Sequence, residues 1–271
     1  MERNPYRKIE IMGIVNLTDD SFFAGSRVLK EDGSFDSGLF LSKVDSMLSE
    51  GADIIDLGAC STRPGSDSIS EEAEWGRLAP ALDLLAKERP GLNISIDTFR
   101  PGIVSRALDI IGPFIVNDVS GGSDGMWKLV GEKGLTYVAM HTRGTPKDMQ
   151  ELTDYDDVVS AVVNFFNGVA QTADEFGVKD WILDPGFGFA KTVDQNWQLL
   201  KEMSVFLKFG RPVLAGLSRK SFLYKPLGIT PGEALPATCA ANLVALQNGA
   251  DILRVHDVAA ARQTLEVYFR E

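Results

Sequence analysis

Short apolar runs alternate with longer amphipathic stretches along the chain, and this alternation restricts the fold more than any other feature. Eight apolar runs lie at residues 9–15, 53–57, 94–97, 114–119, 137–140, 181–183, 213–217 and 252–255. The clearest amphipathic stretches lie at residues 71–87, 156–175, 196–208, 232–247 and 259–269. This pattern predicts parallel strands joined by crossover helices.

The number of repeating units and the chain length distinguish two parallel-sheet architectures. Eight strand–helix units in 271 residues are typical of a closed (β/α)8 TIM barrel of roughly 250 residues. An open doubly wound sheet, the alternative, usually has fewer strands. Because no low-complexity tract or Pro/Ser-rich linker divides the chain, we predict a single barrel domain over residues 1–271.

Composition excludes several classes of function. The net charge of −11 argues against nucleic acid as a partner, since phosphate backbones are bound by arrays of Lys and Arg. The first ten residues have charges and no apolar core, and no run of about 18 uncharged apolar residues follows, so we expect a cytoplasmic protein without a membrane span. Two Cys and two His are too few for a disulfide framework and make a zinc site improbable.

Polar residues follow every predicted strand. In a β/α barrel the active site is built at the C-terminal strand ends, so these positions identify candidate functional residues. They are Asn16, Asp56, Asp97, Asn117, Asp118, His141, Asp184, Ser218 to Lys220, Arg254 and His256. Any single one could be an ordinary polar residue where a strand meets a loop, but together they predict a polar rim.

Three of these residues suit a flat heterocycle. Asp97, Asn117 and Asp184 offer carboxylates and an amide in a low-dielectric barrel mouth, which matches the donors and acceptors of an aminopyrimidinone edge. An unpaired carboxylate there is costly, so at least one should meet a donor in the ligand or be neutralised by Lys220 or Arg254. The alternative is that the aspartates form structural ion pairs within the rim.

A second group of residues suits an anion. The segment STRPGS at 61–66 combines hydroxyls with a guanidinium, which can hold a phosphate through charge-assisted bonds. Lys220 and His256 come from other rim loops and could share the same anion. The loop DPGFGF at 184–189 lacks both the GxGxxG and the P-loop spacing, so nucleotide binding by those motifs is not supported.

Eight motifs in register resemble the dihydropteroate synthases. They are GIVNLT at 13–18, STRPG at 61–65, SIDT at 95–98, ND at 117–118, MH at 140–141 with GTP at 144–146, DPGFGF at 184–189, SRK at 218–220 and RVHD at 254–257. The resemblance covers about residues 9 to 260 and independently implies a β/α barrel. It implies condensation of 6-hydroxymethyl-7,8-dihydropterin diphosphate with p-aminobenzoate to give 7,8-dihydropteroate and diphosphate in folate biosynthesis. It also implies an enzyme of the class that sulfonamides target and a homodimer, as is common in the family.

The resemblance also implies roles for individual residues. The residues implied to bind the pterin are Asp97, Asn117, Asp184, Lys220 and Arg254. Those implied to bind the diphosphate and p-aminobenzoate are Thr62, Arg63, Ser221 and His256. Arg63, Lys220 and Asp97 carry the catalytic roles in this reading. Asn16 would help hold Mg²⁺ on the diphosphate, which needs few protein ligands beside phosphate oxygens and water. The reaction would be a dissociative substitution promoted mainly by electrostatics.

The chain departs from the family pattern in two loops. In the first loop, Asp19 stands where Pro is usual and Ala24 where the family has Asp, so a carboxylate that helps to position the reaction is lost. In the second loop, Ala59 and Cys60 replace Gly-Glu, and we expect Cys60 to be a small rim residue and not a nucleophile.

Two other readings compete. A corrinoid-dependent methyltransferase uses a similar barrel and similar aspartates for its pterin, but it does not need residues 61–65 or 218–220. A non-catalytic pterin-binding homologue would keep the barrel while the first loop, with Ala24, has lost its function.

Overall fold

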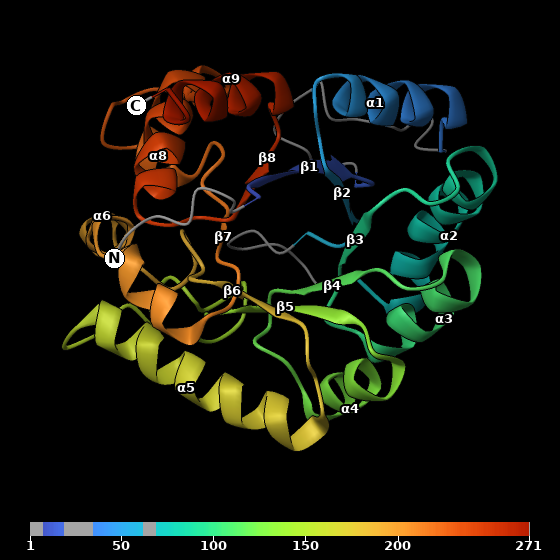
Figure 1. Ribbon diagram of the computed structural model, residues 1–271, viewed down its shortest axis with the longest axis horizontal. Coiled ribbons are helices and arrows are strands. Elements are labelled where there is room, and N and C mark those ends of the chain that lie inside the picture. The colour runs from blue at the N-terminus through green and yellow to red at the C-terminus, as the bar shows by residue number, and fades with distance from the viewer. Residues whose placement is uncertain (1–7, 19–34, 62–68, 271) are drawn as a thin grey trace.

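The computed structural model describes residues 8–18, 35–61 and 69–270, and these form a parallel barrel surrounded by helices (Figure 1). All strand pairs are parallel, in the order β6-β5-β4-β3-β2-β1-β8-β7. The strands are β1 (Glu10–Asn16), β2 (Ile54–Gly58), β3 (Ile94–Asp97), β4 (Ile115–Asp118), β5 (Thr136–Met140), β6 (Trp181–Asp184), β7 (Leu214–Ala215) and β8 (Ile252–Val255). The predicted (β/α)8 fold is confirmed.

Closure of the barrel depends on a narrow contact between β6 and β7. Leu183 forms a parallel bridge with Val213, and its amide donates to the Pro212 carbonyl at 2.9 Å. The predicted strand at 213–217 is correspondingly reduced to Leu214–Ala215. The eight strands therefore form a ring whose C-terminal ends converge on one rim.

Helices occupy the outside of this ring in sequence order, as Figure 1 shows. They are α1 (Ser37–Ser49), α2 (Glu71–Glu88), α3 (Pro101–Ile111), α4 (Asp124–Lys133), α5 (Val158–Phe176), α6 (Val193–Lys201), α7 (Ser221–Tyr224), α8 (Leu235–Gln247) and α9 (Val258–Tyr268), with 3-10 helices η2 (Met203–Phe209) and η3 (Pro231–Glu233). No helix among the described residues is both long and apolar enough to cross a membrane.

Two predicted helices begin or end at different residues for local reasons. The helix predicted at 196–208 starts earlier, because Thr192 and Gln195 form a reciprocal capping box, and it gives way to η2 after Glu202. The helix predicted at 232–247 starts at Leu235, because the preceding residues form η3 with a capping box of their own at Thr230.

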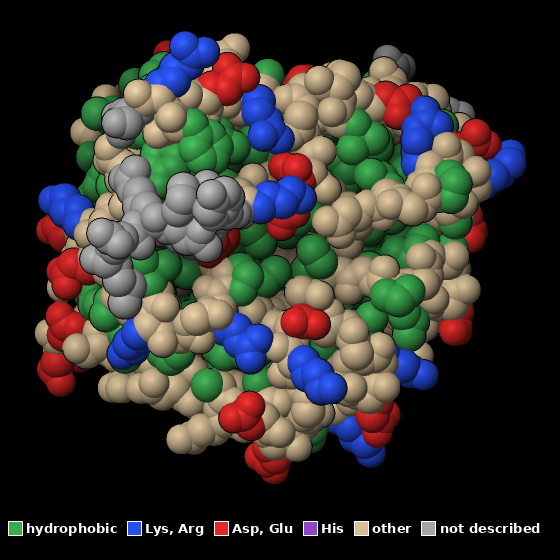
Figure 2. All heavy atoms as spheres, in the orientation of Figure 1, with side chains coloured by type: hydrophobic (Ala, Val, Ile, Leu, Met, Phe, Trp, Pro, Cys, Tyr) green, Lys and Arg blue, Asp and Glu red, His purple; other side chains and the backbone are tan. Residues whose placement is uncertain are grey.

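Successive side chains of a strand point to opposite sides of the sheet, and this alternation divides the apolar core into two layers. One layer fills the barrel with a side chain from most strands, namely Met12, Ile54, Val138, Ile182, Leu214 and Ile252. The neighbouring strand residues point outward and pack against the helices in a larger cluster. On the face shown in Figure 2, acidic and basic side chains are interspersed both around the edge and near the centre, with hydrophobic side chains between them.

Candidate active site

A cavity of about 410 Å³ opens among the C-terminal strand ends and the loops that follow them, within the roughly 300–1,000 Å³ range of small-molecule sites. A smaller cavity of about 30 Å³ lies against it. Both are lined by Asp97, Phe189, Gly216, Lys220 and Arg254. The smaller cavity also takes in Asn117 and Asp184, and the larger one Asn16, Ser221 and His256. Every described residue to which the resemblance assigns a role therefore lines one or both cavities, whereas the rim residues Asp56, Asp118 and His141 line neither.

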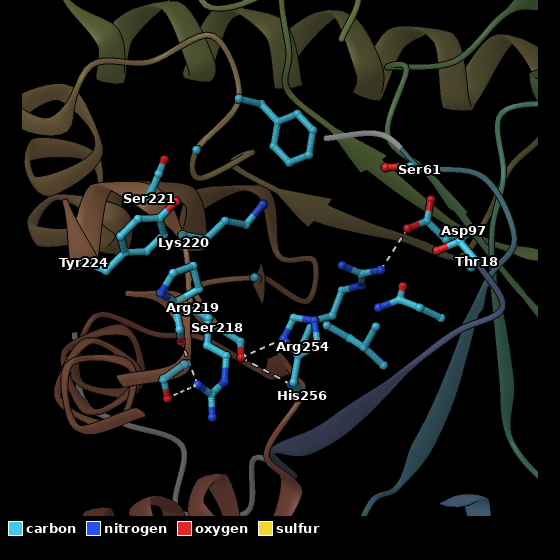
Figure 3. A pocket seen from close by; sticks show the side chains of 18 of the residues that line it. Thr18, Ser61, Asp97, Ser218, Arg219, Lys220, Ser221, Tyr224, Arg254 and His256 are labelled. Carbon is cyan, nitrogen blue, oxygen red and sulfur yellow. Dashed lines mark hydrogen bonds and ion pairs between the residues drawn. The ribbon is translucent and has the colours of Figure 1, made fainter. Parts of the chain in front are cut away.

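The labelled residues of the larger cavity form two sides with a guanidinium between them (Figure 3). Asp97, Thr18 and Ser61 lie on one side, at the ends of β1 to β3. Residues from β8 and the loop after β7, including Ser218, Lys220 and His256, lie on the other. Arg254 extends between the sides toward Asp97. The cavity thus has an acidic side and a basic side.

Arg254 joins two carboxylates at the floor of the cavity. Its Nε donates to Oδ2 of Asp56 at 2.8 Å, and an Nη donates to Oδ2 of Asp97, also at 2.8 Å. The fully buried Asp56 also accepts from Ser95 Oγ at 2.6 Å and from Asn117 Nδ2 at 3.3 Å. These donors satisfy Asp56, which is how a buried carboxylate becomes tolerable. The sequence analysis expected a rim aspartate to meet a ligand donor or to be neutralised by Lys220 or Arg254, and of these the structure shows the contact with Arg254.

Asp97 differs from Asp56 because one of its oxygens is unsatisfied. Oδ1 is buried and has no hydrogen-bond partner among the described residues. Burial raises the pKa of Asp97 to about 7, although the guanidinium of Arg254 opposes this shift. A buried acceptor of this kind suits an N–H donor from a bound molecule, because such a donor would compensate for the loss of water.

Asp184 supplies a second buried carboxylate from the end of β6. Its Oδ1 accepts from the Gly186 amide at 2.8 Å, within the loop that follows the strand. Burial raises the pKa of Asp184, against the hydrogen bond from Gly186 and the nearby charges of Lys220 and Arg254. Two buried carboxylates of elevated pKa in one cavity are the pattern expected of a functional site.

The basic side of the cavity is held by contacts that the sequence does not reveal. Ser218 Oγ lies 3.0 Å from Nδ1 of His256 and accepts from the His256 amide at 3.2 Å. Arg219 forms a fork with the carboxylate of Asp257, with both distances at 2.9 Å. These contacts fix the backbone on either side of Lys220 and keep the cationic groups facing the cavity.

A comparison with known protein families shows to which family the chain belongs. The family model described as "Pterin binding enzyme" matches residues 12–256, which include all eight strand ends or the loops after them. The chain belongs to the pterin-binding enzyme family.

Relatives within this family carry a more specific name. A dihydropteroate synthase from Synechocystis is 39% identical over 266 residues, covering 96% of this chain and 89% of that protein. The dihydropteroate synthase of Thermus thermophilus in complex with 4-aminobenzoate superposes with a TM-score of 0.84 at 36% identity, covering 96% and 93% of the two chains. That of Yersinia pestis with a sulfonamide drug gives 0.87 at 32% identity, covering 96% and 93%.

Some predicted residues of this pterin-binding enzyme lie outside the described residues. They are Thr62 and Arg63 in the second loop and Asp19 and Ala24 in the first. Cys60, at the edge of the second loop, is 9% exposed and lines the larger cavity. Burial and the charge of Glu74 raise the pKa of its thiol, which agrees with the expectation that Cys60 is a rim residue and not a nucleophile.

A magnesium ion fits the donor chemistry of the cavity only in part. Within the described residues no group of three or more His, Cys, Asp or Glu could hold a metal ion, so an all-protein cage is absent there. The half-buried Asn16 lines the larger cavity close to Asp97, with Gly58 between them. Its amide oxygen suits Mg²⁺ that takes most of its ligands from phosphate and water.

Sequence reasoning named Asp56 and Ser218 as rim residues without giving either a role, and it overlooked Phe189 as part of the site. Phe189 lines both cavities, and its ring centroid lies 4.2 Å from Nζ of Lys220, which is a cation–π distance. The role of Asp56 as the partner of Arg254 had no signal in the sequence, because the two residues are 198 positions apart. The aromatic residue within the glycine-bearing loop at 184–189 was the signal for Phe189.

Proposed function

We propose that this family member is a dihydropteroate synthase. It condenses 6-hydroxymethyl-7,8-dihydropterin diphosphate with p-aminobenzoate and releases diphosphate. The observation that carries this proposal is the pair of buried carboxylates of Asp97 and Asp184 in the smaller cavity, beside a larger cavity lined by Lys220 and His256. The names of the relatives and the bound 4-aminobenzoate of the Thermus enzyme support it.

The pterin occupies the smaller cavity and the adjoining floor of the larger one. Its aminopyrimidinone edge presents N–H donors, which Asp184 and Oδ1 of Asp97 accept, and ring acceptors, which Asn117 and Lys220 can satisfy. Ionised carboxylates bind N–H donors better than protonated ones, so the ligand compensates for the burial that raises both pKa values. Arg254 keeps Asp97 oriented and lies at the edge of the ring.

The diphosphate and p-aminobenzoate occupy the mouth of the larger cavity. Lys220, Ser221 and His256 line it there, and Thr62 and Arg63 of the second loop complete this group in the proposal. Asn16 would hold Mg²⁺, which neutralises charge on the diphosphate when bound.

The chemistry divides into two events. The bond between the pterin methylene carbon and the diphosphate oxygen breaks, and the electron pair leaves with the diphosphate. The amine nitrogen of p-aminobenzoate then bonds to the methylene carbon and releases a proton. Lys220 stabilises the departing negative charge, and the cavity aligns the amine with the carbon, so catalysis is mainly electrostatic and positional.

A turnover assay tests the proposal. The purified protein is incubated with both substrates and Mg²⁺, and dihydropteroate is separated chromatographically. We expect product from the unmodified protein and a loss of at least about 100-fold in rate for Lys220→Met, because one preorganised charge is typically worth about that much. Lys201→Met, an exposed position on α6, is the matched control.

The alternative readings give different results in this assay. Pterin binding without product would identify a non-catalytic homologue, and methyl transfer from a methylated pterin to a corrinoid would identify the methyltransferase. Either result overturns the proposed function. A homodimer and a cytoplasmic location remain predictions, of which light scattering tests the first.

A further inference from the structure

Lys191 is a buried lysine directly after the loop at 184–190, and the proposed chemistry makes no use of it. Only 4% of its surface is exposed. Its Nζ lies 2.9 Å from the Gly186 carbonyl, 3.0 Å from the Phe189 carbonyl and 3.0 Å from Nδ1 of His141. An ammonium carries three hydrogens and no acceptor, so these three acceptors, with the His141 carbonyl at 3.4 Å as a longer fourth contact, satisfy it.

His141 is suited to accept from this ammonium. Burial, followed by the charge of Lys191, lowers the pKa of His141 to about 2, so the imidazole is neutral and one ring nitrogen has a free lone pair. The ring packs edge-on against Phe165, with centroids 5.2 Å apart. His141 is not among the described residues that line the two cavities. It is therefore not in a position to contact the substrate directly.

The Lys191 ammonium joins two adjacent strand ends. His141 follows β5, and its amide donates to the Asp184 carbonyl at the end of β6 at 2.9 Å. Lys191 extends this connection into the loop after β6 by binding the carbonyls of Gly186 and Phe189. The loop is therefore attached to the end of β5 by the Lys191 ammonium as well as by the hydrogen bond between the two strand ends.

The same loop presents two groups to the ligand cavities. The Gly186 amide orients the carboxylate of Asp184 at 2.8 Å, and the Phe189 ring lies against Lys220. The carbonyl of each of these two loop residues accepts a hydrogen bond from Lys191, and both residues line the smaller cavity. Movement of the ammonium would therefore move both ligand-facing groups.

The backbone of the loop adopts conformations that need external support. Gly186 has φ +70°, and a Cβ there would lie 1.9 Å from the His141 carbonyl oxygen. Ala190 has φ +47°, which is uncommon for a residue with a side chain. Besides Lys191, Asn196 also supports the loop, because its side-chain oxygen accepts a hydrogen bond from the Gly188 amide at 2.7 Å.

We propose that Lys191, paired with neutral His141, is a positioning residue for the pterin site that acts through the loop at 184–190. The identity of the ligand in this proposal rests on the proposed function. Burial lowers the pKa of Lys191 to about 7, and the carboxylate of Asp184 opposes this shift. The three acceptors favour the charged form, as expected for a lysine that serves as a fixed donor.

The test measures ligand affinity and loop exchange in Lys191→Met, which keeps the length of the side chain and removes its donors. Calorimetry with 6-hydroxymethylpterin should show affinity weaker by about tenfold, the effect of losing a charge-assisted hydrogen bond. Hydrogen exchange should accelerate in the peptide that covers residues 184–192. Lys201→Met should change neither. A lower melting temperature with unchanged pterin affinity in the folded protein would show that Lys191 is merely structural and would overturn the proposal.

A second variant covers the case in which Lys191→Met does not fold. His141→Phe keeps a ring of similar size against Phe165 and removes one acceptor. We expect about threefold to tenfold weaker pterin binding and faster exchange in the same peptide. Unchanged values for both would overturn the proposal. Neither measurement depends on turnover, so a protein that binds 6-hydroxymethylpterin but forms no dihydropteroate would contradict the proposed function alone.

Discussion

Replacing Arg254 by Met should destabilise the barrel in a manner that depends on pH. The guanidinium binds Asp56 and Asp97, and the three side chains are only 18%, 0% and 10% exposed. Met has a similar length but no charge, so two buried carboxylates lose their shared cation. Removing one partner of a buried ion pair typically costs about 3–5 kcal/mol. At about 2–4 °C per kcal/mol for a large domain, the melting temperature should fall by about 6–20 °C.

The direction of the pH effect follows from Asp97. Burial raises its pKa in the folded protein to about 7, well above the usual range of an aspartate, and Arg254 opposes the shift. Loss of Arg254 raises that pKa further. The folded variant then takes up protons more readily than the unfolded chain, so its stability is lowest above the folded pKa and recovers as pH falls. The difference in melting temperature between variant and unmodified protein should be larger at pH 8.5 than at pH 6.

Differential scanning fluorimetry at these two pH values measures the effect. Arg89→Met is the matched control, because Arg89 forms a comparable fork with Asp45 on the surface, where the side chains are 37% and 46% exposed. Such exposed pairs are worth about 0–1 kcal/mol. Melting temperatures for Arg254→Met within about 2 °C of the unmodified protein at both pH values would refute the idea that Arg254 compensates the two carboxylates.

Three further predictions concern ligands. Because ionised Asp97 binds an N–H donor best and its pKa is about 7, pterin affinity should be about tenfold weaker at pH 6 than at pH 7.5. Calorimetry on Asp97→Asn should show a shallower profile, because only the buried carboxylate of Asp184 remains to titrate, and an equal slope in both proteins would contradict the role of Asp97. Exhaustive chelation should abolish turnover and added Mg²⁺ should restore it, whereas full activity after chelation would remove Mg²⁺ from the account. In a titration, p-aminobenzoate should bind about 5–150-fold more tightly when magnesium diphosphate is present. The gain should fall in the lower half of that range, because Ala24 replaces an acidic residue. In Arg63→Ala the gain in affinity should be smaller. Equal affinity with and without magnesium diphosphate would refute ordered binding.

The strands could be predicted wherever burial is strong on both faces. Residues 94–97 and 252–255 were predicted with the bounds that the structure shows, since both runs are short, the first ends at Asp97, and His256 follows the second. The run at 213–217 was too long because the ladder there is limited to Leu214 and Ala215, and the following glycine leads into the loop that carries Lys220. Apolar character alone does not reveal where strand pairing stops.

The members of the site could be predicted more readily than their partners. Asp97 and Asp184 were predictable because a carboxylate at the end of a buried strand is exceptional. The pairing of Arg254 with Asp56 joins residues 198 positions apart, and that of Lys191 with His141 spans 50. Such pairings arise from barrel closure and loop geometry, neither of which leaves a local pattern in the sequence.

Affinity for a pterin in Asp184→Asn is the measurement that tests the central claim most directly. An amide offers one acceptor oxygen and presents its own N–H groups to the ligand, so it cannot replace the carboxylate. The matched control is Asp118→Asn, a buried carboxylate that binds Ser120 and Tyr137 and does not line either cavity. Calorimetry with 6-hydroxymethylpterin should show a loss of at least about 1.5–3 kcal/mol, or roughly 10-fold to 150-fold, for Asp184→Asn and near-normal affinity for folded Asp118→Asn. Affinity of Asp184→Asn within about threefold of the unmodified protein would contradict the assignment of this cavity to the pterin.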